Sequence, residues 1–328
     1  MTAAWFCHAI FPRHVPTMTS FQIFERVLAV VIPVFLIAGV GFAYAQYKAH
    51  LAKKAKAFGN PMDIASLNVM MLDILAPLLV FTALADKGFD LYAQRWVIVG
   101  GLIVVLGSGL VAWLVAALRG YDIKSFVSPA MFNNCGNMGL PLAVFAFGQE
   151  GLMAAIALFT ASNLMHFTLG VKILSPKANL IDVLKTPLTA AMVLGLLSNA
   201  THIYLPQPIF DGLKLLGQAA IPLMLFMLGI RMAQSKLDGF GAGFVCAIIN
   251  PAAGMAAAYA ASFFIPLTGK EFAYVLMFAS LPPAVLNALM AVQYKANLSQ
   301  TMSAVVWGHA LSLISVPVAV AIGFASLS

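Results

Sequence analysis

The chain has 328 residues, of which 62% are hydrophobic and 9% are charged, against about 25% charged residues in a typical soluble domain. This composition excludes a water-soluble globule and a disordered chain. The apolar runs are continuous and do not alternate with polar residues, which excludes an outer-membrane barrel and predicts an all-α polytopic membrane protein. The formal net charge of +7 does not indicate nucleic-acid binding, because Lys and Arg gather in the cytoplasmic loops of membrane proteins.

Ten apolar runs of about 20 residues, the length of a transmembrane helix, follow one another along the chain. The predicted spans are 27–47, 63–85, 96–118, 127–148, 151–174, 187–204, 209–232, 243–266, 272–293 and 299–326. Gly148-Gln-Glu-Gly151 predicts a tight turn between the fourth and fifth spans. Residues 1–20 form an N-terminal extension in which Met18 is an alternative start, and no residue spacing predicts a metal site or a cofactor.

The basic residues are divided unequally between the two sides of the predicted bundle. The connections after odd-numbered spans contain twelve: Lys48, Lys53, Lys54, Lys56, Arg119, Lys124, Lys172, Lys177, Lys185, Arg231, Lys236 and Lys295. The opposite side contains six: Arg13, Arg26, Lys87, Arg95, Lys214 and Lys270. The positive-inside rule therefore predicts a cytoplasmic location for the twelve and an outside location for both termini, in a bacterial inner membrane.

Two passages suggest an internal repeat. Asp73–Phe81 in span 2 matches Gln218–Phe226 in span 7, with the polar residue, the Pro and the Phe in register. At a similar offset, Pro141 of span 4 falls near Pro282 and Pro283 of span 9. We therefore expect a first five-helix repeat at 21–175, a cytoplasmic linker at 176–186 and a second, inverted repeat at 187–328; chance is the alternative, because Ala, Pro and Leu are common here.

Spans 4 and 9 contain residues that break a transmembrane helix. Span 4 includes Phe132-Asn-Asn-Cys-Gly-Asn-Met-Gly-Leu-Pro141, and span 9 includes Ser280-Leu-Pro-Pro-Ala-Val-Leu-Asn287. Freed backbone groups at bilayer depth persist only where protein or a water-filled cavity satisfies them, and the N-termini of half-helices attract anions. The alternative is close helix packing by the small residues, with the asparagines as interhelical hydrogen bonds.

These motifs resemble a known family. Asn134-Cys-Gly-Asn-Met-Gly139-Leu-Pro141 is similar to the span-4 signature of the auxin efflux carrier family, and similarity continues in Leu67-Asn68 with Pro77–Phe81, in Leu281–Ala284 with Asn287, and in Val306–Gly308 with Pro317. The resemblance implies a ten-span, five-plus-five inverted repeat with broken, crossing helices 4 and 9 and elevator-type alternating access. The short segment from Leu174 to Thr186 favours the bacterial permeases linked to malonate and malate.

The resemblance also implies where the substrate binds. Asn134 is expected at the crossing, in contact with a substrate carboxylate, and Asn287 is expected at the corresponding position of span 9. The full set of candidate substrate-binding residues is Asn134, Asn137, Gly136, Gly139, Pro141, Pro282, Pro283 and Asn287.

The sequence thus predicts a secondary transporter that moves a small organic acid across a lipid bilayer. Two alternatives remain: a cation/proton antiporter of the same architecture, and an intramembrane enzyme. The expected partners are the acid, sodium or a proton as coupling ion, the bilayer and a second copy of the chain in a homodimer, with no nucleic acid.

Asp73 is the one acidic residue deep within a predicted span, and buried ionisable groups in membranes are usually functional. With Gln218, Asn163 and His309 it forms the set of coupling-ion candidates. Asp73 in a neutral, helix-tying role is an equally good interpretation. His166 and His309 are more often hydrogen-bonded packing residues than proton relays.

Overall fold

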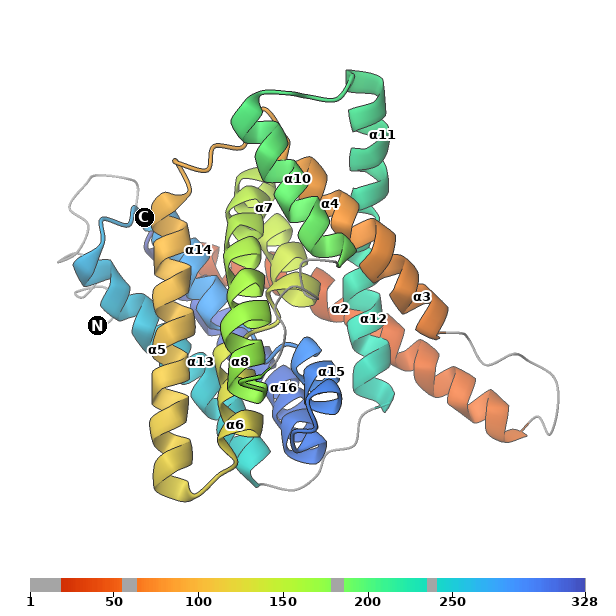
Figure 1. Cartoon of the computed structure of the whole chain (residues 1–328), viewed down its shortest axis with the longest axis vertical. Helices are drawn as coiled ribbons and strands as arrows, with labels where there is room; N and C mark the ends of the chain where they lie inside the picture. The colour runs from red at the N-terminus through yellow and green to blue at the C-terminus, as the bar shows by residue number, and fades with distance from the viewer. Residues whose placement is uncertain (1–18, 55–63, 178–185, 235–240, 328) are drawn as a thin grey trace.

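The computed structural model describes residues 19–54, 64–177, 186–234 and 241–327 (Figure 1). Over these ranges the chain is almost entirely helical, as predicted. Met18 and most of the N-terminal extension, Lys56, most of the predicted linker, and Lys236 lie outside them. Six helical segments are long and apolar enough to cross a membrane: Ser20–Leu51, Arg95–Arg119, Cys135–Leu174, Gln207–Gln234, Ala242–Phe264 and Leu298–Ala325. Met71–Leu84 and Pro187–Thr201 are shorter apolar helices, and the chain is a polytopic all-α membrane protein.

The first half of the chain contains helices of very different length. In order they are α2 (Ser20–Lys54), α3 (Ile64–Met70), the π-helical turn η1 (Met71–Leu75), α4 (Ala76–Leu84), α5 (Arg95–Arg119), α6 (Ile123–Met131), the π-helical turn η2 (Cys135–Gly139), α7 (Leu140–Met165), the π-helical turn η3 (His166–Gly170) and α8 (Val171–Leu174). The second half contains α10 (Pro187–Thr201), α11 (Gln207–Gln218), α12 (Ala220–Gln234), α13 (Ala242–Phe264), α14 (Gly269–Ala279), α15 (Leu286–Gln293) and α16 (Leu298–Ala325).

Several predicted spans are interrupted at Pro or Gly. In span 2 the wide turn η1 ends two residues before Pro77, because proline has no N–H for the helical ladder and its ring needs room on the preceding turn. In α7, Gly148 has φ of 65° and ψ of −147°, a conformation open to glycine. The predicted turn between spans 4 and 5 therefore lies at Gly148, and α7 consists of one helical part before this residue and one after it.

Helices α2 and α12 pack together through glycine. A Cβ atom on Gly229 of α12 would overlap the backbone carbonyl oxygen of Ala38, and one on Gly41 of α2 would overlap that of Phe226. Such close approach of backbones is typical of membrane helices, where small residues replace the hydrophobic driving force of water. These two glycines therefore determine how near the helices lie.

The two ends of the bundle are recognisable from its connections. Helices α5, α8 and α12 end toward the lower part of Figure 1, and the connections from α4 to α5 and from α10 to α11 lie at its upper end. At the upper end Lys214 of α11 forms an ion pair with Asp86 at 2.8 Å. Partial burial raises the pKa of Asp86, but its hydrogen bonds with Lys214 and the Gly88 N–H and the Lys214 charge outweigh that effect and keep it below the ordinary value.

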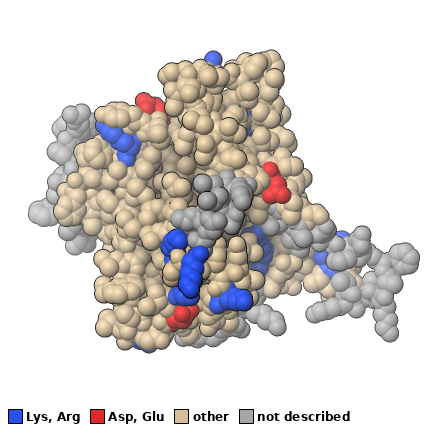
Figure 2. Space-filling model, viewed as in Figure 1, with Lys and Arg blue, Asp and Glu red and all other residues tan. Residues whose placement is uncertain are grey.

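Charge is sparse on the surface. Figure 2 shows a face that is mostly uncharged, with several Lys and Arg side chains together in its lower half. Arg119 ends α5 and Lys172 lies in α8, and both of these helices end in the lower half of Figure 1. Arg231 lies in the last turn of α12, as Arg119 does in α5.

Candidate functional site

The site is formed where two helices stop inside the protein. Helix α6 begins at an Asp122 cap that accepts from the Ser125 N–H and ends at Met131. Phe132 is extended, with φ of −109° and ψ of 106°, and Asn134 precedes the turn η2. In the second half, α14 ends at Ala279 and α15 begins at Leu286. The asparagine and proline runs between these pieces leave backbone groups that helices do not satisfy.

The backbone groups left free in the two breaks form hydrogen bonds with each other. Asn133 and Pro283 form an antiparallel bridge, in which the Asn134 N–H donates to the Pro282 carbonyl at 2.6 Å and the Ala284 N–H donates to the Phe132 carbonyl at 2.9 Å. The side chain of Asn133 donates to the Phe278 carbonyl at 2.5 Å. Segments about 150 residues apart are thereby held together at a buried crossing.

Asn287 stabilises this crossing, and both hydrogens of its side-chain amide are already in hydrogen bonds. Its Nδ2 donates to the carbonyls of Phe132 and Ala284, both at 3.0 Å, and its Oδ1 accepts from Ser128 at 2.9 Å. The side chain is 1% exposed. The arrangement does not fit the expected role of Asn287 as a second donor to substrate.

The bridge brings residues of the two breaks level with one another. Counted from Asn133 and Pro283, Asn137 and Asn287 both lie four residues further along the chain. By the same count Asn134 is level with Ala284, whereas the resemblance implied Asn287 at the corresponding position.

Asn134 lies at the centre of the site. It is 3% exposed, and its Nδ2 lies 2.9 Å from Nε2 of His309 on α16. The other ring nitrogen of His309, Nδ1, lies 2.7 Å from the Val305 carbonyl. Because a carbonyl only accepts, Nδ1 holds the hydrogen, and Nε2 is the acceptor for the Asn134 amide.

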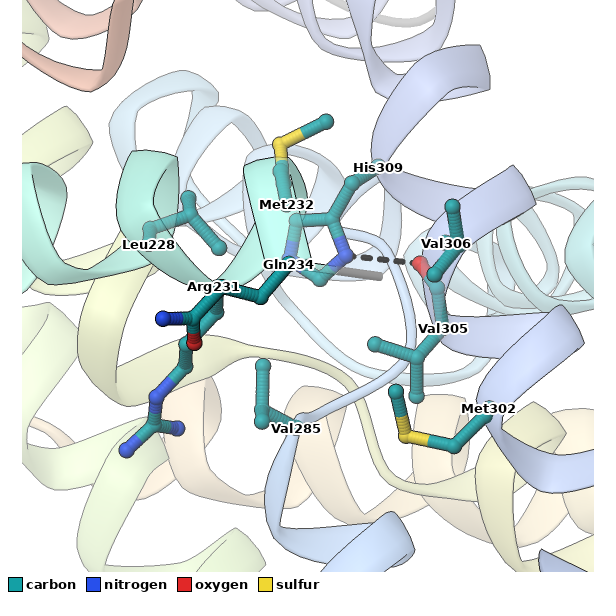
Figure 3. A pocket seen from close by; sticks show the side chains of 9 residues that line it. All are labelled: Leu228, Arg231, Met232, Gln234, Val285, Met302, Val305, Val306 and His309. Carbon is teal, nitrogen blue, oxygen red and sulfur yellow. Dashed lines mark hydrogen bonds between the residues drawn. The ribbon is translucent and has the colours of Figure 1, made fainter. Parts of the chain in front are cut away.

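His309 also lines a cavity of about 220 Å³, so the hydrogen bond between Asn134 and His309 lies beside that cavity. Figure 3 shows its lining: Leu228, Arg231, Met232 and Gln234 come from α12, Val285 from the segment before α15, and Met302, Val305, Val306 and His309 from α16. Arg231 is half-buried. The cavity therefore combines one permanent positive charge, a neutral imidazole and an amide with an apolar wall, a set suited to a small anion with an apolar body.

The remaining substrate-binding candidates support the crossing. Gly139 is buried against Leu281, whose Cδ1 would lie 2.9 Å from an added Cβ, and Gly136 is similarly close to Phe159. Pro141 lies in the first turn of α7, and Asn137 is half-buried. Pro282 supplies the carbonyl that Asn134 binds, and Pro283 packs so closely on Gly308 that a Cβ there would overlap its ring.

The coupling-ion candidates do not come together. Asp73 and Gln218 are both exposed on the protein surface, so the protein does not itself enclose Asp73 as the sequence argument assumed. Asn163 donates to the Phe159 carbonyl of its own helix at 2.9 Å. His166 is buried and stacks on Phe132 with ring centroids 4.1 Å apart, and only His309 lines the cavity.

Arg231 is the residue that sequence reasoning missed. It follows the apolar run Ile221–Ile230 without a break, and the count of basic residues placed it in a loop. The signal that identifies it is helical continuity: α12 extends through Arg231 to Gln234, which carries the guanidinium to the wall of the cavity.

Comparison with known proteins agrees with this architecture. Residues 177–320, which include α12, the second break and most of α16, match a family described as membrane transport proteins. This match covers somewhat less than half of the chain, and together with two relatives that are named transporters it makes the chain similar to membrane transport proteins.

Two similar proteins are archaeal. An uncharacterized transporter of Methanothermobacter thermautotrophicus is 28% identical over 274 residues, covering 78% of this chain and 87% of the relative. An uncharacterized transporter of Methanocaldococcus jannaschii is 26% identical over 225 residues, covering 63% of this chain and 71% of the relative. These similarities and the long apolar helices agree with a multi-pass membrane protein that is similar to transporters.

Proposed function

We propose that the chain is a secondary transporter of a small organic anion, a carboxylate of the malonate or malate type, in the cytoplasmic membrane. One observation supports this most directly: the Asn134 amide at the crossing is hydrogen-bonded to His309, which shares a cavity with Arg231. A carboxylate beside Arg231 would gain charge-assisted hydrogen bonds. Neutral donors complete the site without holding the anion so tightly that it cannot be released.

The proposal includes ten spans arranged as two inverted five-span repeats. Support comes from pairs of contacts that a two-fold axis would exchange. Helix α2 packs on α12 and α10 packs on α4, while α6 packs on α13 and α14 packs on α5. The antiparallel bridge of Asn133 with Pro283 has a local two-fold axis of the same kind. In this scheme the broken fourth span consists of α6 and the part of α7 before Gly148. The broken ninth span consists of α14 and α15.

The proposal also includes elevator-type alternating access, which the same packing supports. Helices α2, α4, α10, α11 and α12 form one group of close contacts, and α5, α6, α13, α14 and α16 form another. The cavity lies between α12 of the first group and α16 of the second. Sliding of the second group past the first would move the crossing relative to the bilayer and so expose the anion to either side.

Removing the amide of Asn134 tests the site. The purified protein in liposomes is assayed with labelled acetate, malonate, malate and succinate, and at least one acid should enter faster than into protein-free liposomes. Asn134→Ala should weaken the apparent affinity for that acid at least about tenfold, since a hydrogen bond to a charged group contributes roughly 1.5–3 kcal/mol. Asn199→Ala is the matched control, because that amide binds the Asp86 and Phe89 carbonyls at the far end of the bundle and its loss should leave affinity near wild type. Wild-type affinity and rate in Asn134→Ala would contradict the assignment.

The orientation is tested separately. We expect both termini outside the cytoplasm, because twelve basic residues lie on one side in the sequence and six on the other. A phosphatase that is active only outside the cytoplasm, fused to the C-terminus, should be active, and a fluorescent protein that matures only inside should be dark. The reverse pattern would overturn the orientation but not the transport function.

A further inference from the structure

We propose that transport is coupled to a proton bound at Nε2 of His309, and that the Asn134 amide rotates to link the proton to the anion. This inference rests on the proposed function, which supplies the anion. It concerns the hydrogen-bond chain from the Val305 carbonyl through His309 to Asn134. The chain joins a cavity wall on α16 to the crossing of the two breaks.

The chain has one position where a proton can be added. Nδ1 of His309 is 2.7 Å from the Val305 carbonyl and already holds its hydrogen. Nε2 has a lone pair that accepts from the Asn134 NH₂ group at 2.9 Å. A proton taken from the aqueous phase on the open side forms a new N–H bond at Nε2, and the imidazole becomes a cation with two donors.

Protonation reverses the requirement placed on Asn134. An Nε2–H cannot face an NH₂ group, but an asparagine amide presents an oxygen on its other arm in nearly the same shape. Half a turn of the amide places Oδ1 against His309 and sends the NH₂ group to the opposite side. Asn134 therefore acts as an acceptor on its free arm when His309 is neutral and as a donor when His309 is charged.

That reversal links the two ligands. A carboxylate near Asn134 is repelled by an amide oxygen and bound by an amide NH₂, so it favours the protonated state of His309. By thermodynamic reciprocity the proton strengthens anion binding by the same factor. A cavity with only Arg231 has one positive charge, and the proton supplies the second, which matches a dicarboxylate better than a monocarboxylate.

The positions of the charged and titratable groups on the elements around His309 make it the residue of the cavity that can take up a proton. Helix α16 has no Asp, Glu, Lys or Arg, and α15 has none within Leu286–Gln293. Ionisable residues do occur on the other packed elements. They are Glu25, Arg26, Tyr44, Tyr47, Lys48, His50, Lys53 and Lys54 on α2, with Arg26 over the Phe324 ring; Asp122 and Lys124 at the start of α6; Lys270, Glu271 and Tyr274 in the first part of α14; Cys246 and Tyr259 on α13; Cys135 in η2; and Arg231 on α12. Of these, Arg231 is the one that lines the cavity within the described part of the chain.

The experiment measures protons and anions together. In liposomes containing a pH-sensitive dye, the acid of the panel above with the highest rate is driven inward by its own gradient. The wild-type protein should move about one proton per anion. In His309→Gln the anion flux should fall and the ratio should drop to near zero. His166→Gln is the matched control, because His166 is a buried histidine that does not line the cavity, and its ratio should stay at the wild-type value.

Three results would overturn the coupling. One is wild-type anion flux with no associated proton movement, which would leave the proposed function intact. Another is a wild-type ratio in His309→Gln. The third is loss of the ratio in Asp73→Asn but not in His309→Gln, which would place coupling at Asp73. Absence of any anion flux in the wild type would instead contradict the proposed function.

A measurement on the wild-type protein guards against a misfolded His309 variant. Titration calorimetry of the same acid is performed in two buffers with different ionisation enthalpies. The difference in binding enthalpy should correspond to uptake of about one proton per anion at a pH above the range where His309 is charged without ligand. Equal binding enthalpies in the two buffers across the whole pH range would exclude proton-linked binding.

Discussion

Arg231→Gln should bind the transported anion at least about tenfold, and up to roughly a hundredfold, more weakly than the wild type. Arg231 is the one permanent charge among the cavity-lining residues, and a hydrogen bond to a charged group contributes roughly 1.5–3 kcal/mol. Glutamine keeps a donor of similar reach but removes the charge. The apparent affinity is measured from the concentration dependence of labelled uptake into proteoliposomes.

Two further variants test whether the loss of anion affinity in Arg231→Gln comes from the loss of its charge at this position. Arg231→Lys keeps the charge without the planar pair of donors and should fall between the wild type and the glutamine variant. Lys270→Gln removes a basic residue whose side chain is 62% exposed and pairs with Glu150, so it should transport normally. Wild-type affinity in Arg231→Gln, in protein with an unchanged melting temperature, would remove Arg231 from the site.

Gly229→Ala should destabilise the protein strongly. The added Cβ would overlap the Ala38 carbonyl oxygen, with the Phe42 amide nitrogen 2.8 Å away. Both neighbours are backbone, so helices α2 and α12 would have to move apart along their contact. Overpacking of this kind typically costs about 1–3 kcal/mol, which corresponds to a fall in melting temperature on the order of 2–10 °C.

Gly39→Ala is the matched control for that prediction. Gly39 lies in α2 as well, near the same contact, but a Cβ added there would meet no neighbouring atom within 4 Å. Alanine also favours helix over glycine, so the melting temperature should stay the same or rise. Equal melting temperatures for the two variants in detergent would show that the α2–α12 contact does not depend on glycine.

The sequence by itself determined the class of the protein and the place of its broken helices. A low charged fraction and continuous apolar runs leave only a helical membrane protein, because the bilayer requires every spanning backbone to satisfy itself. The prolines and asparagines of 132–141 and 280–287 predicted interruptions, since proline lacks an N–H. Both interruptions are present, and Gly148 turns the chain where a turn was predicted.

Only the tertiary structure decided which of these residues form the site. Asn134 and His309 are 175 residues apart and meet because the two breaks pair as antiparallel backbone, a register that no local pattern contains. The same pairing uses up the amide of Asn287, and the continuity of α12 brings Arg231 to the cavity while Asp73 lies on the surface. Local composition determines which segments form apolar, interrupted spans. Long-range hydrogen bonds between the interrupted spans determine which polar groups already have partners and which face the cavity.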